Sequence, residues 1–337
     1  MKYERMALAA CIIAAQLGPR GSPALANDSS AELSVGGLVF KHTSDVAIES
    51  EDLWVSPDEI VVRYRFRNQT STPVKLTVAF PLPDIDLSEA ANLAVPTSDP
   101  VNFVGFQTKV DGKSVGFQMV QRAYLGGTDV SAKVKEAGLP LFPFGTDQDR
   151  FNNLPEPVRT RLLDEGLIIP TGSDERGRDL YGGAWVVKTS VLREQVFPAG
   201  RSVAVEHRYK ASVGMSFDTV LRKALRESRG MKAEFERYRK DYCISDELLK
   251  SIDGLAGNTP SNTAHLQERR ISYVLTTGAN WAGPIRDFHL VIDKGQPDRL
   301  ASFCADKVNK LSATAVEVRL KDFTPTRDLK ILIIGRR

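Results

Sequence analysis

The feature that most constrains this fold is a short-range alternation of apolar and polar residues. Between Glu59 and Arg67 every second residue is bulky and apolar, namely Ile60, Val62, Tyr64 and Phe66. Successive side chains of a strand point to opposite faces, so a period of two indicates half-buried β-strands. Similar runs predict strands at 33–41, 74–80, 103–110, 114–121, 184–192, 202–211, 271–276, 288–292, 315–320 and 329–334. Asp111-Gly112 separates two of these runs and predicts an antiparallel hairpin.

The middle of the chain has a different pattern. Helical spacing at 129–137 and 156–165 is followed by Gly138 and Gly166, the residue type that commonly ends helices. Between them lies the apolar segment 139–144, which either forms a recognition loop or packs onto a sheet. We therefore predict a mainly β fold with helical insertions, built from antiparallel β-sandwich-like regions. Its parts are an N-terminal β region (27–127), a helical insertion (128–181) and a C-terminal β region (182–337).

The C-terminal region contains a predicted amphipathic helix at 219–242. From Leu221 to Lys240 it has eight basic residues against three acidic ones, and Gly230 weakens its middle. Its basic face either binds an acidic partner or a membrane surface, or is a solvated outer face over the sheet. A second short helix is predicted at 300–311, carrying Cys304.

The first 26 residues are predicted to be an export signal. Lys2 and Arg5 precede an apolar run at 6–17, and Ala24 and Ala26 supply small residues for cleavage before Asn27. One alternative is a membrane anchor, but the apolar run is shorter than the roughly 20 residues that span a membrane. The other is a lipoprotein acylated at Cys11. We therefore expect a periplasmic or secreted protein with no transmembrane segment after cleavage.

Charge and cysteine content restrict the class of function. Losing three basic residues and one acidic residue with the signal lowers the net charge from +3 to +1, and no nucleic-acid-binding module is present. Nucleic acid is therefore not an expected partner. The remaining cysteines, Cys243 and Cys304, form an even pair in an oxidising compartment, which predicts a disulfide, with two buried thiols as the alternative.

The sequence lacks recognisable catalytic and metal-binding motifs. The sequence has no nucleophile elbow, ligand-spaced histidine pair or phosphate-binding glycine loop, so no catalytic residue, cofactor or metal is predicted. Asp84 and Asp86 resemble the start of a calcium loop, but Glu89 occupies the glycine position of an EF-hand, which leaves a looser cation site as the alternative. Asp287 and His289 alternate on a predicted strand, where the histidine would be a base if a nucleophile lay beside it.

Several segments together resemble a family of exported bacterial proteins catalogued only as a domain of unknown function, family 4424. The resemblance covers the whole mature chain, and the segments that carry it are 27–38, Tyr64–Asn68, Phe80–Asp84, Tyr242-Cys243 and Asn280–Phe288. It implies an exported protein without an assigned activity, cofactor or catalytic residue. The stretch from Tyr64 to Pro83 also looks like part of the β-sandwich domain shared by vault proteins and inter-alpha-trypsin inhibitors.

The most distinctive string is Asn280–Phe288. Trp281 is either a core residue or, if exposed beside Arg286 and Asp287, the centre of a binding surface. We expect a non-catalytic binding module that contacts an envelope protein or a cell-wall component. The alternatives are a periplasmic hydrolase that cleaves cell-wall glycan with two carboxylates, and a structural or assembly factor of the envelope.

Overall fold

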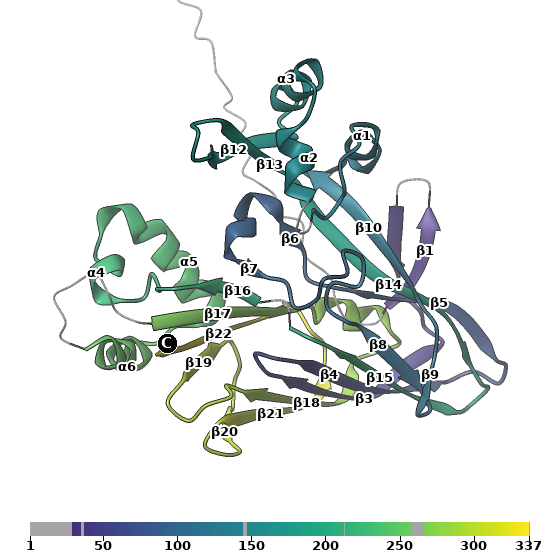
Figure 1. Ribbon diagram of the computed structural model, residues 1–337. Helices are drawn as coiled ribbons and strands as arrows, with labels where there is room; N and C mark the ends of the chain where they lie inside the picture. The colour runs from purple at the N-terminus through teal and green to yellow at the C-terminus, as the bar shows by residue number, and fades with distance from the viewer. Residues whose placement is uncertain (1–28, 35–36, 144–146, 212, 258–265, 337) are drawn as a thin grey trace, which may run out of the picture.

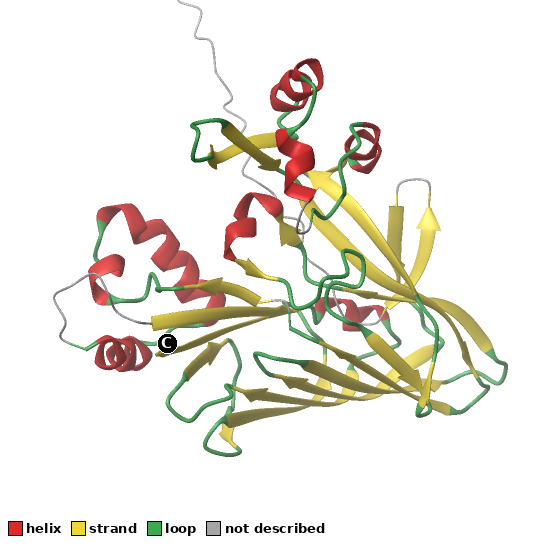
Figure 2. Ribbon diagram, viewed as in Figure 1, coloured by secondary structure: helices red, strands yellow, loops and turns green. Residues whose placement is uncertain are grey.

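A computed structural model describes residues 29–34, 37–143, 147–211, 213–257 and 266–336 (Figure 1). The predicted export signal therefore lies outside the described residues. Strands dominate, in several mostly antiparallel sheets with helices at the periphery, as Figure 2 shows. This confirms the predicted fold class.

The largest sheet has eight strands in the order β20-β21-β18-β3-β4-β15-β8-β9. Its pairs are antiparallel except β3 with β18, which is parallel. The predicted alternation holds in β4, where Tyr64 and Phe66 face the core. The predicted hairpin is confirmed, since β8 pairs with β9 and positive φ at Asp111 and Gly112 suits its tight turn. The strand bounds are β3 Val46–Val55, β4 Ile60–Asn68, β8 Gln107–Val110, β9 Lys113–Ser114, β15 Ser202–Tyr209, β18 Ile285–Asp293, β20 Asn309–Lys310 and β21 Ala315–Phe323.

A second sheet, β11-β10-β14-β5-β1-β2 with β6 paired to β14, packs against the first. Aromatic rings fill the space between the two sheets: Phe197 of β14 meets Phe66 at 5.8 Å between ring centroids, and Phe80 of β5 meets Phe106 at 5.3 Å. The two sheets thus form a sandwich. The strand bounds are β1 Ser29–Ser34, β2 Gly37–Lys41, β5 Val74–Pro81, β6 Ile85–Asp86, β10 Gln118–Leu125, β11 Thr128–Asp129 and β14 Val186–Phe197.

The third sheet, β19-β22-β17-β16-β7, is covered on both faces. Ile271 and Ile331 join the main core, whereas Leu266 and Leu332 pack under helices α5 and α6, seen at the left of Figure 1. A sheet buried on both sides can hold polar residues only where a cavity or a partner satisfies them. The bounds are β7 Leu93–Ala94, β16 Val213–Ser216, β17 Leu266–Tyr273, β19 Leu300–Phe303, β22 Leu329–Arg336, α4 Lys223–Arg226, α5 Lys232–Tyr242 and α6 Asp246–Ala256.

The helical insertion lies at the end of strands β10 and β14, at the top of Figure 1. Its apolar segment is packed inward: Leu139, Leu141 and Phe142 are buried, and the Trp185 indole donates to the Leu141 carbonyl at 2.7 Å. Within the described residues the segment is therefore core, not a recognition loop; Phe144 lies outside them. The bounds are α1 Ser131–Glu136, α2 Gln148–Asn152, α3 Glu156–Asp164, β12 Ile168–Ser173 and β13 Asp179–Gly183.

Several secondary-structure predictions were wrong in part. The strand at 103–110 begins only at Gln107, and the strand at 114–121 is divided between β9 and β10, which lie in different sheets. The single strand at 33–41 is the hairpin β1–β2. The helix at 300–311 is absent, because residues 300–303 pair with the edge of β22 as β19, and the sheet supplies the backbone partners that a short helix would leave unmade. The helix at 219–242 breaks after α4 and resumes as α5, with Gly230 in the short 3₁₀ turn Arg229–Met231 between them.

Candidate functional site

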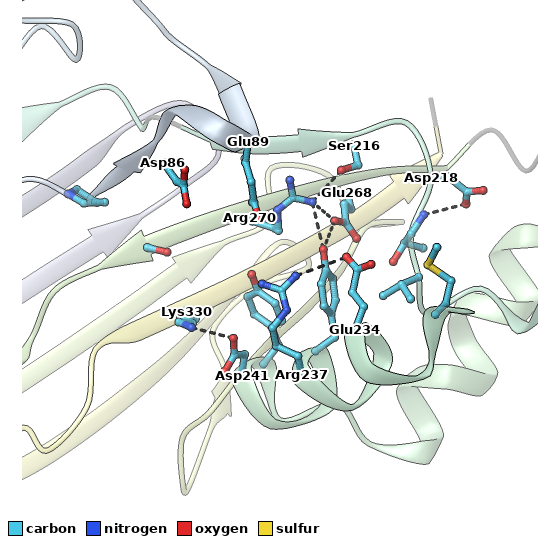
Figure 3. Close-up of a pocket in the computed structure, with 18 of the residues that line it drawn as sticks. Asp86, Glu89, Ser216, Asp218, Glu234, Arg237, Asp241, Glu268, Arg270 and Lys330 are labelled. Carbon is cyan, nitrogen blue, oxygen red and sulfur yellow. Dashed lines mark hydrogen bonds and ion pairs between the residues drawn. The ribbon is translucent and has the colours of Figure 1, made fainter. Parts of the chain in front are cut away.

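A cavity of about 620 Å³ lies between α5 and the helix-covered face of the third sheet. Its remaining wall is formed by β6 and the 3₁₀ helix Leu87–Asn92 that follows it. In Figure 3, Asp86 and Glu89 come from this wall, while Glu234, Arg237 and Asp241 come from α5. Five segments far apart in the sequence thus converge on one space of the size that binds small molecules.

The sheet supplies the floor through strand alternation. Glu268, Arg270 and Ser272 are spaced by two along β17 and therefore point to one face, toward the cavity. The register places Gly214 of β16 beside Arg270, and Ser216 beside Glu268. The floor of the cavity is consequently polar, and the apolar contacts that hold α5 and α6 against the sheet surround it.

Helix α5 forms the opposite wall. Glu234, Arg237, Tyr238, Asp241 and Tyr242 are spaced by three or four residues, which places them on one side of the helix. The two tyrosines are buried and pack edge to face at 5.3 Å between ring centroids. The charged residues of this face lie at the cavity wall, so α5 combines packing with polar lining.

A buried hydrogen-bond network crosses the floor. The Tyr238 hydroxyl donates to Glu268 Oε1 at 2.6 Å, and Arg270 Nη1 donates to the same oxygen. Arg270 Nη1 also donates to Ser216 Oγ at 2.8 Å and to the Tyr238 hydroxyl at 3.2 Å. The Glu268 side chain is 2% exposed, and its second oxygen, Oε2, has no donor among the described residues.

Burial sets the protonation of this network. It raises the pKa of Tyr238, and the adjacent Glu268 charge raises it further. Burial also raises the pKa of Tyr242 to about 12. Burial opposes the charge of Arg270, but the Glu268 carboxylate more than compensates and raises the Arg270 pKa. At neutral pH both phenols therefore remain proton donors and Arg270 remains charged.

The lining has an excess of negative charge. Seven carboxylates face three basic residues, and two further cations pair with these carboxylates from outside: Lys188 with Asp84 at 2.6 Å and Arg222 with Asp218 at 2.6 Å. Two negative charges are left uncompensated. They correspond to Asp86, which accepts hydrogen bonds from the N–H and hydroxyl of Ser88, and to Glu89, which is exposed and makes no ion pair with another described residue.

The predicted disulfide is present, joining Cys243 to Cys304. Cys243 caps the C-terminus of α5 in the left-handed conformation, and Cys304 directly follows β19. The bond therefore fastens one wall of the cavity to the edge of the sheet that forms its floor.

Trp281 is 1% exposed, with ring centroids 4.6 Å from Phe66 and 6.0 Å from Phe197. The interpretation of Trp281 as an exposed binding surface was therefore wrong, because the sandwich core covers the indole. Arg286 and Asp287 are exposed at the start of β18, where Asp287 pairs with Lys321, and neither lines the cavity. Their binding role stays a prediction.

Among the other candidate residues, His289 and Asp84 are occupied by ion pairs. His289 lies between Asp52 and Glu317, at 3.2 and 3.0 Å from its two ring nitrogens, so neither nitrogen faces an open space as a base would. Asp84 pairs with Lys188, and within the described residues no three acids, histidines or cysteines are placed to hold a metal ion.

The basic residues between Leu221 and Lys240 are partly neutralised by ion pairs. Arg222 pairs with Asp218, and Arg226 makes two hydrogen bonds to Asp253 of α6 at 2.7 and 2.6 Å. The remaining basic residues of α4 and α5 are exposed. In the described part of the chain no helix is long and apolar enough to cross a membrane.

The profile of one protein family, described as "Domain of unknown function (DUF4424)", matches residues 26–332. The chain belongs to the DUF4424 family. This confirms the resemblance stated above.

No curated protein matches this DUF4424 chain significantly. Among solved structures, a crystal structure of a candidate nutrient binding protein from Legionella pneumophila is similar at 12% identity, with a TM-score of 0.42, over 92% of this chain and 70% of that one.

Proposed function

We propose that this protein is a non-catalytic binding module that holds a small polar solute in the cavity between α5 and the third sheet. The observation that carries the proposal is the buried network of Glu268, Arg270 and Tyr238 in the cavity floor. Polar groups fixed by one another at the base of a cavity are pre-organised, so a solute that pairs with them loses little free energy in ordering the site.

We further propose that the module acts in the periplasm or outside the cell after removal of residues 1–26. The predicted signal and the disulfide between Cys243 and Cys304 support this placement, since disulfides persist in oxidising compartments. In that location the solute comes from the envelope or from the medium, and an envelope protein is the natural recipient. The exposed Arg286 and Asp287 stay candidates for that second contact.

The test is a thermal-unfolding screen against polar solutes of positive, neutral and negative charge. Ser272→Trp places a large side chain in the cavity, and Ser173→Trp makes the same change on an exposed strand of the insertion. We expect a solute to raise the midpoint of the wild type and of Ser173→Trp, but not of Ser272→Trp. Equal stabilisation of all three proteins, or of none, contradicts the proposal.

The hydrolase alternative predicts a different result in a parallel assay. Incubation with purified cell-wall glycan should release fragments, and replacing one cavity carboxylate by its amide should abolish that release. Fragment release that depends on Glu234 or Glu268 would replace the binding proposal with a catalytic one.

A further inference from the structure

We infer that the cavity selects solutes of net positive charge that carry an amine together with an oxygen acceptor, the chemistry of basic amino acids and amino sugars. The inference rests on the proposed binding function and names its ligand class. Three independent features support it: the net charge of the lining, the unpaired oxygen of Glu268 and the free donors of Arg270.

The charge of the lining favours a cation. After the outside cations Lys188 and Arg222 are counted, two carboxylate charges remain without a partner in the part of the chain that the structure describes. A partly enclosed cavity with walls of low dielectric concentrates this field, which attracts cationic solutes and repels anionic ones. Each lining cation is already paired with a lining acid: Arg237 with Glu234, Lys330 with Asp241, and Arg270 with Glu268.

Glu268 supplies a second, local reason. Both donors that reach its carboxylate, Tyr238 and Arg270, bind Oε1, while Oε2 is buried without any donor among the described residues. A buried carboxylate oxygen without a donor is unfavourable in free energy. A positive charge bound in the adjoining cavity lowers that free energy, whether it reaches Oε2 directly or acts through the field.

The side chain of Arg270 explains why the solute should carry an oxygen acceptor. Its three hydrogen bonds all use Nη1, so Nε and Nη2 have no acceptor within the described parts of the chain. Gly214 lies directly beneath them: a Cβ at this position would be 2.9 Å from Nε and 3.2 Å from Nη2. The glycine thus leaves room for the guanidinium to lie against β16, with two N–H groups available to a carboxylate or hydroxyl oxygen.

The experiment is isothermal titration calorimetry with two series that vary in charge on related frameworks. The first is glucosamine, glucose and glucuronate, and the second is lysine, norleucine and glutamate. We expect the cation of at least one series to bind about tenfold or more tightly than its neutral counterpart, and the anion to bind more weakly still. A neutral or anionic solute that binds as tightly as the cation overturns the inference.

Variants assign the preference to named residues. Glu268→Gln keeps the shape and removes the charge, and Asp86→Asn with Glu89→Gln removes the two uncompensated charges from exposed positions of the cavity wall. Glu136→Gln, an exposed acid on α1 outside the cavity, is the control. We expect the double variant to lose most of the tenfold preference and the control to keep it; a double variant with the wild-type preference overturns the inference even if Glu268→Gln does not fold.

Failure of the ligand class is distinguishable from failure of the binding function. If neutral or anionic solutes bind the wild type but not Ser272→Trp, the cavity is a binding site and only its selectivity was misassigned. If solutes bind both proteins equally, or if no solute of either series binds the wild type, the binding function itself is contradicted.

Discussion

Replacing Trp281 by alanine tests whether the distinctive string Asn280–Phe288 serves the core. The indole is 1% exposed and contacts two phenylalanines, one from each sheet of the sandwich. Burial of about 200 Å² of aromatic surface at about 25 cal/mol per Å² is worth about 5 kcal/mol, of which the alanine retains a part. Truncation of a buried tryptophan is therefore expected to lower the free energy of unfolding by about 3–5 kcal/mol.

The assay is urea and thermal unfolding followed by circular dichroism. For a chain of this size the loss corresponds to a fall in midpoint of about 4–8 °C. The matched control is Trp54→Ala, which removes a half-buried indole from the outer face of β3 in the same large sheet. We expect the control to lose less than half as much stability. An unchanged midpoint for Trp281→Ala would refute the assignment of this residue to the core.

Three further predictions concern the cavity and the helices beside it. Removing the disulfide with Cys243→Ser and Cys304→Ser should lower the free energy of unfolding by up to roughly 4 kcal/mol, because the bond links residues 61 positions apart and so restricts the unfolded chain. Equal urea midpoints for the variant and the wild type would contradict this. Gly214→Ala should displace the Arg270 guanidinium and weaken solute binding about tenfold, whereas unchanged affinity would show that the guanidinium is not used. The hydrogen bonds from Arg226 lower the pKa of Asp253 from its ordinary 3.8, so the stability they give is present above that pH and is lost as pH falls through the lower folded value. Asp253→Asn should therefore reduce the fall of the melting temperature at acidic pH. An equally steep fall in the variant would exclude this ion pair as its cause.

The strands could be predicted because their pattern is local. In β4 the alternation of polar and apolar residues reports directly which face meets the core, and the Asp111-Gly112 turn reports its own backbone conformation. The disulfide was also accessible, because only two cysteines remain beyond the predicted signal.

Sheet membership could not be predicted. The strands β14 and β15 follow one another closely, yet they pair in different sheets of the sandwich. The alternation within each strand gives its faces but contains no information on its neighbours, which depend on contacts across more than a hundred residues. The wrong helix prediction at residues 300–303 has the same cause, because these residues form a strand only through their pairing with the distant strand β22.

The cavity was invisible in the sequence for a related reason. Glu268, Arg270 and Glu234 belong to no motif with fixed spacing, and the walls are assembled from five separate segments. One signal was present in the sequence. Glu268 and Arg270 follow Leu266 at alternate positions of β17, so the two charged residues share a strand face with an apolar residue that packs under a helix. Charged residues on a strand face that elsewhere contacts a helix require partners, and this strand could have been singled out on that basis.

The most direct test of the account is a crystal structure of the protein grown with the cation that binds most tightly in calorimetry. The account predicts electron density for the solute between α5 and the third sheet. Its oxygen should lie within hydrogen-bonding distance of Arg270 Nε or Nη2, and its amine should lie toward Glu268 or the Asp86–Glu89 wall. Density for the bound solute at any other place on the molecule would contradict the account.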